Sequence, residues 1–221
     1  MKNSEFYTLE GLIDFSLVEY PNSMYESMVT LGNDYGMYWG TFIHGELGTN
    51  GIDVESGDVF LDLGANIGMS SRYALMKGAK EVFCYEPDPG MMTLLRQNIT
   101  TNVKFFQYFV MNKRGEHSCR YWPGKTEEIY TAPAITLQDV LNFFPYEKID
   151  YLKMDIEGAE ETVFDTMGWN ECSRIKKMMV EHHYPSTTME FVHKLCIKGF
   201  NVIIEFGAGQ NYLHCRHLGN L

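Results

Sequence analysis

From residue 58 onward, short apolar runs alternate with stretches whose apolar positions recur at helical spacing. The run 59–63 (VFLDL) is apolar except for one acid, which is typical of a strand buried on both faces of a parallel sheet. The stretch 136–144 (TLQDVLNFF) instead has the period of a helix, with Thr136 as its cap. Strands that alternate with helices predict an α/β domain, in which helices cover both faces of a mostly parallel sheet.

The same pattern predicts the individual elements. The main strands are expected over 58–63, 81–86, 103–110, 149–154, 177–181, 200–206 and 211–216, with a further antiparallel strand over 117–122. The helices are expected over 69–77, 88–98, 136–144, 159–167 and 189–198. The last two strands form a hairpin, so one edge strand should be antiparallel. We expect the first five main strands in the spatial order 3-2-1-4-5.

Residues 1–50 lack this alternation. Their pattern allows short helices over 6–18 and 23–31, followed by a glycine-rich loop. We treat 1–50 as an N-terminal extension or cap of the same unit, which either faces the substrate or packs on the sheet. Residues 51–221 then form the domain itself.

Composition excludes some partners. A net charge of −11 over 221 residues argues against a nucleic-acid partner, because phosphates repel such a surface. No apolar run is long enough to span a membrane, and no signal peptide is recognisable. The five cysteines form no CxxC pair and indicate buried thiols of a reducing cytoplasm.

The turn after the first strand carries the main chemical signal. Gly64 and Gly68 allow a tight turn that leads into a helix, and Asp62 sits at the end of the strand, where open α/β sheets bind ligands. A dinucleotide would require Gly-x-Gly-x-x-Gly, but Asn66 and Met69 occupy the second and third glycine positions. The turn therefore suits a ligand with a positive centre and no pyrophosphate, such as S-adenosylmethionine. Asp62 would meet its amino group, and the N–H groups of the turn its carboxylate.

Glu86 supplies a second signal at the end of the next strand. An acid at this place accepts hydrogen bonds from both ribose hydroxyls of a nucleoside. This feature supports a nucleoside ligand but is shared with NAD enzymes.

Three ordered motifs resemble one known family. VFLDLGANIG at 59–68, YEPDP at 85–89 and IDYLKMDIEGAE at 149–160 are similar to the FkbM-type S-adenosylmethionine-dependent methyltransferases. The resemblance implies a single seven-stranded Rossmann-like domain with an antiparallel last strand and S-adenosylmethionine bound by Asp62, Gly64, Asn66, Gly68, Glu86 and Asp155. It also implies methylation of an oxygen, often on a sugar, glycan or natural-product hydroxyl.

Such a reaction needs a base for the acceptor hydroxyl. Asp155 and Glu157 lie at the end of the fourth strand, beside the donor, and Lys153 can neutralise them. His182 and His183 follow the fifth strand, where the family shows a shorter acid–x–histidine pattern. We favour His182 with Asp155 and Glu157 as catalytic groups. A metal site formed by Asp155, Glu157 and a histidine stays open as an alternative, but no ligand spacing demands a metal, so none is assigned.

Two alternatives remain at this point. An NAD-dependent oxidoreductase would keep the strand–turn–helix unit and Glu86 but conflicts with Asn66 and Met69. A non-catalytic cofactor-binding protein should have lost the acids or the glycines, and this chain keeps them.

Overall fold

The computed structural model describes residues 7–8, 11–12, 47–48, 51–120, 129–207 and 209–220. Most of the expected N-terminal extension, including the helix predicted over 23–31, therefore lies outside the described residues. Within 6–18, Tyr7–Thr8 (β1) and Gly11–Leu12 (β2) pair as antiparallel strands, so a helix over these positions is wrong.

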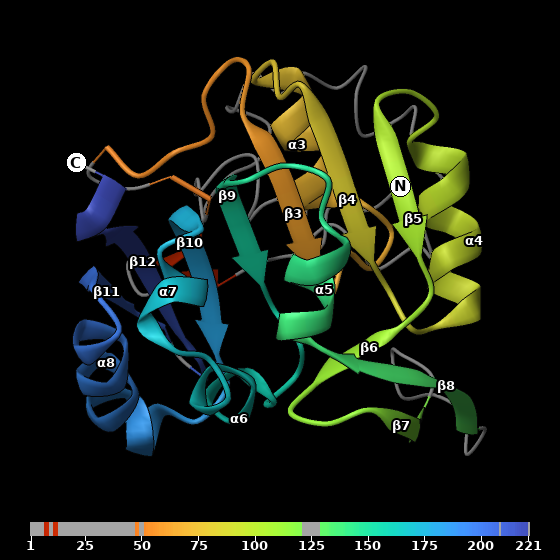
Figure 1. Cartoon of the computed structure of the whole chain (residues 1–221). Coiled ribbons are helices and arrows are strands. Elements are labelled where there is room, and N and C mark those ends of the chain that lie inside the picture. The colour runs from red at the N-terminus through yellow and green to blue at the C-terminus, as the bar shows by residue number, and fades with distance from the viewer. Residues whose placement is uncertain are drawn as a thin grey trace.

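A seven-stranded sheet forms the centre of the domain (Figure 1). Its strand order is β11-β12-β10-β9-β3-β4-β5. The strands are β3 (Val59–Leu63), β4 (Glu81–Tyr85), β5 (Val103–Phe106), β9 (Ile149–Met154), β10 (Ile175–His182), β11 (Phe200–Phe206) and β12 (Asn211–His217). The expected order of the first five strands is confirmed.

The last strand, β12, is antiparallel as expected, but it does not lie at the edge of the sheet where the hairpin pattern placed it. β12 pairs antiparallel with both β10 and β11, so it lies inside the sheet, and the edge strand β11 runs parallel to the others. Insertion between two partners satisfies the hydrogen bonds on both sides of β12 and buries its apolar residues, such as Leu213 and Cys215. The hairpin pattern alone could not tell which of its two strands would pair with β10.

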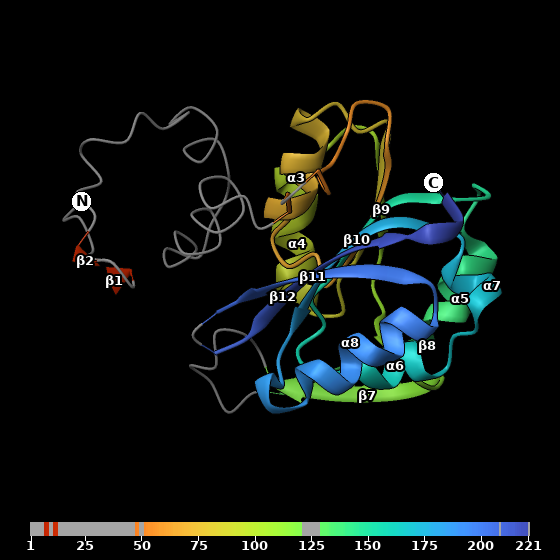
Figure 2. The ribbon, with the colours of Figure 1, turned by 90° about the vertical axis from the view of Figure 1, so that its left-hand side faces the viewer.

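Helices cover both faces of the sheet, as predicted (Figure 2). On one face, α3 (Met69–Met76) and α4 (Pro89–Asn98) pack on the core that contains Phe60 and Tyr151. The other face is covered by α5 (Leu137–Phe143), α6 (Glu160–Asp165), α7 (Trp169–Cys172) and α8 (Thr188–Ile197). Short 3-10 helices span Pro185–Thr187 and Leu218–Asn220. In the described parts of the chain, no helix has the length and apolar character needed to cross a bilayer.

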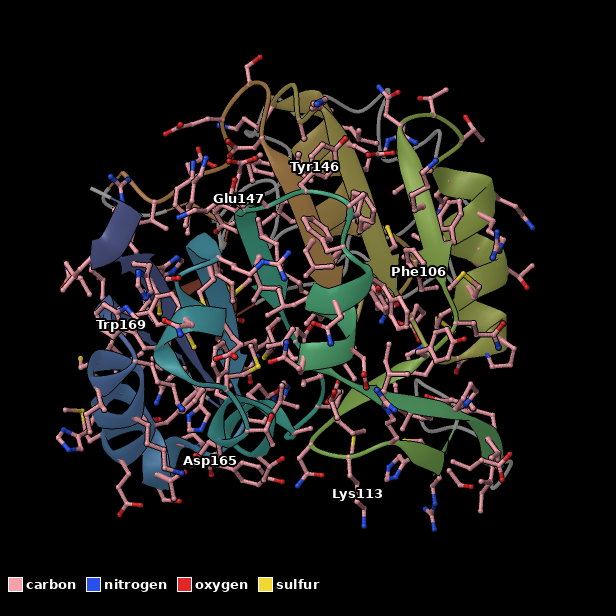
Figure 3. All side chains as sticks on the ribbon, viewed as in Figure 1. Phe106, Lys113, Tyr146, Glu147, Asp165 and Trp169 are labelled. Atoms are coloured by element: carbon pink, nitrogen blue, oxygen red, sulfur yellow. The ribbon has the colours of Figure 1, made fainter. Side chains whose placement is uncertain are left out.

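A separate three-stranded sheet lies at the carboxyl ends of the central strands (Figure 1). It contains β6 (Phe109–Met111), β8 (Ile129–Thr136) and β7 (Gly115–Arg120), in that order. The single strand expected over 103–110 is wrong, because the chain leaves the main sheet after Phe106 and re-pairs with β8 (Figure 3). The antiparallel strand expected over 117–122 is confirmed as far as Arg120; residues 121–128 lie outside the described part.

Candidate active site

A cavity of about 490 Å³ opens at the carboxyl ends of the central strands. The strand order reverses here, because the chain passes from β3 to β4 in one direction and later adds β9 on the other side of β3. Such switch points are where open α/β sheets bind ligands. The lining residues are Gly64, Asn66, Tyr85, Glu86, Pro87, Asp88, Met91, Tyr108, Phe109, Val110, Met111, His117, Cys119, Arg120, Tyr130, Asp155, Ile156, Glu157, Gly158, Ala159 and Thr162.

The turn after β3 packs against the end of β9. Gly64 has a φ of +79°, and a Cβ at this position would lie 1.7 Å from the carbonyl oxygen of Asp155. Asn66 also adopts a left-handed conformation, with a φ of +51°, which asparagine tolerates better than most residues. The close approach of the two loops brings the predicted cofactor turn and the predicted catalytic acids to one wall of the cavity.

The N–H groups of this turn already have partners within the protein. Gly64 and Ala65 donate to the carbonyl oxygen of Tyr85, and Gly68 donates to that of Ala65. Asn66 donates to Glu86, and Ile67 to the side chain of Asn66. A ligand carboxylate at this turn, as the sequence predicts, would have to exchange one of these bonds.

Glu86 is held by the backbone on the cavity wall. Its two carboxylate oxygens accept hydrogen bonds from the N–H groups of Asn66 at 2.7 Å and Asp88 at 2.8 Å. Burial raises the pKa of Glu86 to about 7, from an ordinary value of 4.5. The carboxylate is therefore fixed in place. Further hydrogen-bond donors, such as ribose hydroxyls, would stabilise its charged form.

Asp62 does not line the cavity. It is fully buried on the α3 side of the sheet, where Ser71 donates to its Oδ2, and its Oδ1 lies 3.6 Å from Lys153 Nζ. Burial raises the pKa of Asp62. In this position Asp62 contacts Ser71 and Lys153, and any effect on a ligand in the cavity would pass through them.

Lys153 joins the two loops at the bottom of the site. Its Nζ donates to the carbonyl oxygen of Gly64 at 2.6 Å and to Asp155 Oδ2 at 3.2 Å. Burial disfavours the ammonium, but the carboxylates of Asp155 and Asp62 outweigh it and raise the pKa of Lys153. The expected neutralisation of the acids by Lys153 agrees with these contacts.

Asp155 and Glu157 both line the cavity, as the sequence analysis expects of catalytic acids. Asp155 Oδ1 is buried and has no hydrogen-bond partner among the described residues. Glu157 has a φ of +56°, which is uncommon for a residue other than glycine. Burial by the surrounding loop and the charge of Asp155 raise the pKa of Glu157.

The two histidines at the end of β10, His182 within the strand and His183 after it, point in opposite directions. His182 is fully buried on the α8 side, where its ring nitrogens contact Thr188 and Glu161, each at 3.0 Å. His183 faces the acids instead, with Nδ1 3.0 Å from Glu160 and Nε2 3.7 Å from Asp155. His182, the histidine favoured from sequence, is thus not brought together with Asp155 and Glu157, whereas His183 is.

The surroundings of His183 favour its charged form. Burial alone would lower the pKa of this imidazole, but its hydrogen bond to Glu160 and the charges of Glu160, Asp155 and Glu157 raise the pKa to about 9. A signal for this residue was present in the sequence, because Glu181 and His183 have the acid–x–histidine spacing and share one side of an extended chain.

Comparison with known proteins identifies the class of this site. Residues 62–202 match the methyltransferase FkbM domain, and this range contains Asp62, Glu86, Asp155 and His183. The chain belongs to the FkbM methyltransferase family. Membership of this family implies S-adenosylmethionine as the methyl donor. Among curated proteins, none matches the sequence.

Three solved structures that this chain resembles are named as methylases or methyltransferases. An rRNA methylase from Streptococcus thermophilus has 9% identity and a TM-score of 0.50, over 75% of this chain and 89% of its own. A putative rRNA-methylase from Clostridium thermocellum has 10% identity and a TM-score of 0.52, over 86% and 98%. A putative RNA methyltransferase from Pyrococcus horikoshii has 20% identity and a TM-score of 0.47, over 90% and 91%. At these identities the first two support the Rossmann-like fold of the FkbM domain and nothing finer.

The cavity fits the implied cofactor. Its volume lies within the usual range for small-molecule sites, about 300–1,000 Å³. Its wall carries two buried carboxylate oxygens that have no hydrogen-bond partner among the described residues, one on Asp155 and one on Asp88. Glu86 and Glu157 add two further carboxylates. Such a wall is complementary to a ligand that carries a sulfonium, an ammonium and ribose hydroxyls.

Proposed function

We propose that this FkbM-family protein is an O-methyltransferase that transfers a methyl group from S-adenosylmethionine to a hydroxyl of a sugar, glycan or small natural product. The observation that carries the proposal is that Asp155 and Glu157 share one cavity with Glu86. Glu86 can thus hold a nucleoside while Asp155 or Glu157 receives a proton from an acceptor in the same cavity. The bound cofactor supplies a methyl group on a positively charged sulfur.

On this proposal, Glu86 binds the ribose hydroxyls. Its oxygens are already oriented by two backbone N–H groups, so little ordering is needed when the ligand binds. Gly64, Asn66 and Gly68 form the turn beneath the cofactor, and Asp62 supports it indirectly, through Lys153. Alignment of donor and acceptor accounts for most of the rate, because the methyl group is already activated.

The acceptor hydroxyl has to lose a proton during transfer, and we assign this step to the carboxylates of Asp155 and Glu157. Both line the cavity, and Asp155 has an oxygen without a partner among the described residues. His182 contacts Thr188 and Glu161 instead, so we propose His183 in its place, as a group that orients Asp155 and balances its charge. A positioned base contributes about 10²–10⁴-fold to the rate.

Calorimetry tests the donor. We expect the full-length protein to bind S-adenosylmethionine and not NAD, because Asn66 stands where a dinucleotide turn needs glycine. Binding of NAD without binding of S-adenosylmethionine would overturn the proposal.

A screen of hydroxylated acceptors, read out as release of S-adenosylhomocysteine, tests the reaction. With an acceptor in hand, Asp155→Asn should lower kcat by about 10²-fold, whereas Asp165→Asn, an exposed acid on α6, should leave it unchanged. Full activity in Asp155→Asn would remove this residue from the mechanism.

A further inference from the structure

The His183 side chain lies close to four carboxylates beside the cavity. Its Nε2 is 3.5 Å from Glu157 Oε2, 3.7 Å from Asp155 Oδ1 and 3.8 Å from Glu181 Oε1. These distances exceed those of hydrogen bonds, so Nε2 faces three oxygens with a small space between them. The side chains of Asp155, Glu181 and His183 each bring one ligand atom into a group that spans at most 4.8 Å.

The other ring nitrogen fixes the direction of the imidazole. Nδ1 donates to Glu160 Oε1 at 3.0 Å, and Glu160 is fully buried. The same oxygen accepts the N–H groups of Ile156 and Gly158, so Glu160 is itself held by the loop that carries Asp155. A carboxylate that binds one nitrogen of a histidine and leaves the other nitrogen for a cation is the usual support of metal-ligating histidines.

Carboxylates outnumber cationic groups among the described residues of the cluster. Four carboxylates, those of Asp155, Glu157, Glu160 and Glu181, surround one imidazole. Lys153 contacts Asp155 through Oδ2, whereas the buried Oδ1, which faces His183, has no hydrogen-bond partner among the described residues. An unsatisfied buried carboxylate oxygen is costly, and it points into the space between the ligand atoms.

We propose that Asp155, Glu181 and His183 bind a divalent transition-metal ion, with Glu157 as a further ligand, and that the ion displaces the proton of His183 Nε2 into solvent. Bonds of about 2.0–2.2 Å separate two ligands of one ion by about 3.0–4.4 Å, so the widest pair has to contract by only a few tenths of an ångström. One imidazole with carboxylates suits Mn²⁺ or Zn²⁺ better than Ca²⁺, which takes oxygen ligands alone.

The site borders the methyl-transfer cavity through Asp155 and Glu157. An ion there would stabilise a deprotonated acceptor hydroxyl next to Asp155, and this role rests on the proposed function. Metal binding itself does not rest on it.

Electron paramagnetic resonance of free Mn²⁺ tests the site directly. Full-length protein, treated with chelator and then desalted, is titrated with MnCl₂ in the absence of cofactor and acceptor. We expect one bound Mn²⁺ per chain, displaced by Zn²⁺. His183→Ala and Glu181→Gln should each weaken Mn²⁺ binding at least about tenfold, and Glu160→Gln about 10–100-fold because the imidazole loses its support.

Glu190→Gln, an exposed acid on α8, is the matched control and should bind Mn²⁺ as the unmodified protein does. Thermal unfolding of each variant without metal shows whether it is folded. No Mn²⁺ binding by the unmodified protein, or undiminished binding by the folded His183→Ala and Glu181→Gln variants, would overturn the metal site. Because no methyl transfer is measured, this failure is distinguishable from failure of the proposed function.

Discussion

At the site, backbone N–H groups from different turns fix the orientation of individual side chains. Glu86 illustrates this, because its carboxylate is oriented by the N–H group of Asn66 on the preceding turn and by that of Asp88 on the following one. Burial raises the pKa of Glu86 to about 7, although the hydrogen bonds from these two N–H groups act in the opposite direction. A group that changes charge near neutral pH should couple ligand binding to pH.

The sign of this coupling follows from the two forms of Glu86. Ribose hydroxyls donate to the charged carboxylate, so binding lowers the pKa of Glu86 and releases a proton below about pH 7. We expect the affinity for S-adenosylhomocysteine to rise by up to about tenfold from pH 6 to pH 8. Calorimetry in buffers of different ionisation enthalpy measures both the affinity and the proton release.

Glu86→Gln is the control for this effect, because it keeps the shape of the side chain and removes its titration. The pH dependence should disappear, and affinity should be low throughout. A variant with the same pH profile as the unmodified protein would assign the dependence to another group.

The raised pKa of Glu86 also affects the stability of the protein without ligand. The folded state holds the proton of Glu86 more tightly than the unfolded state, so the free energy of unfolding falls as pH rises from about 4.5 to 7, by up to about 3 kcal/mol.

Among elements, the turn after β3 and the end of β9 depend on each other. The backbone of Gly64 lies so close to the carbonyl oxygen of Asp155 that no side chain fits, and Lys153 bonds to both residues. The turn therefore positions the catalytic loop as well as the cofactor.

Gly64→Ala should destabilise the protein by about 3 kcal/mol or more, since it adds a clash with backbone to the strain of a left-handed alanine. Gly57→Ala is the matched control. Gly57 has a φ of +91° with no atom within 4 Å of an added Cβ, so only the strain of about 1–2 kcal/mol should appear. Chemical denaturation gives both values, and equal losses would show that the contact with Asp155 does not matter.

Elements were predictable from sequence where their pattern is local. β3, β9 and α5 follow directly from apolar runs and from the cap at Thr136, which forms a capping box with Asp139. The pattern over 103–110 predicts one continuous strand, but this part of the chain divides between two sheets. Its division depends on pairing with β8, a long-range contact that no local pattern records.

The whole molecule is strongly acidic, and this bears on the acceptor. Two of the solved structures compared above are named as rRNA methylases, but they share only 9–10% identity with this chain. A net charge of −11 opposes binding of a polyanion, and the described lining residues of the cavity include four carboxylates.

We therefore expect no binding to a ribosomal RNA fragment in a gel-shift experiment at about 150 mM salt, and no release of S-adenosylhomocysteine with that RNA. A hydroxylated small molecule or glycan should serve as acceptor under the same conditions. Methylation of the RNA and of no small molecule or glycan would contradict the proposed acceptor class and would indicate a nucleic-acid substrate.

The alternating α/β pattern, the order of the central strands, the turn at 62–68 and the acids at the strand ends are all predictable from the amino-acid sequence, because they depend on local periodicity and on motif residues. Three features require the folded chain: which of the acids face the cavity, the orientation of Asp62 towards Ser71, and the contact of Asp155 with His183 rather than with His182. Neighbouring side chains on extended backbone point to opposite sides, and packing between strands and helices far apart in the sequence sets which side meets the site.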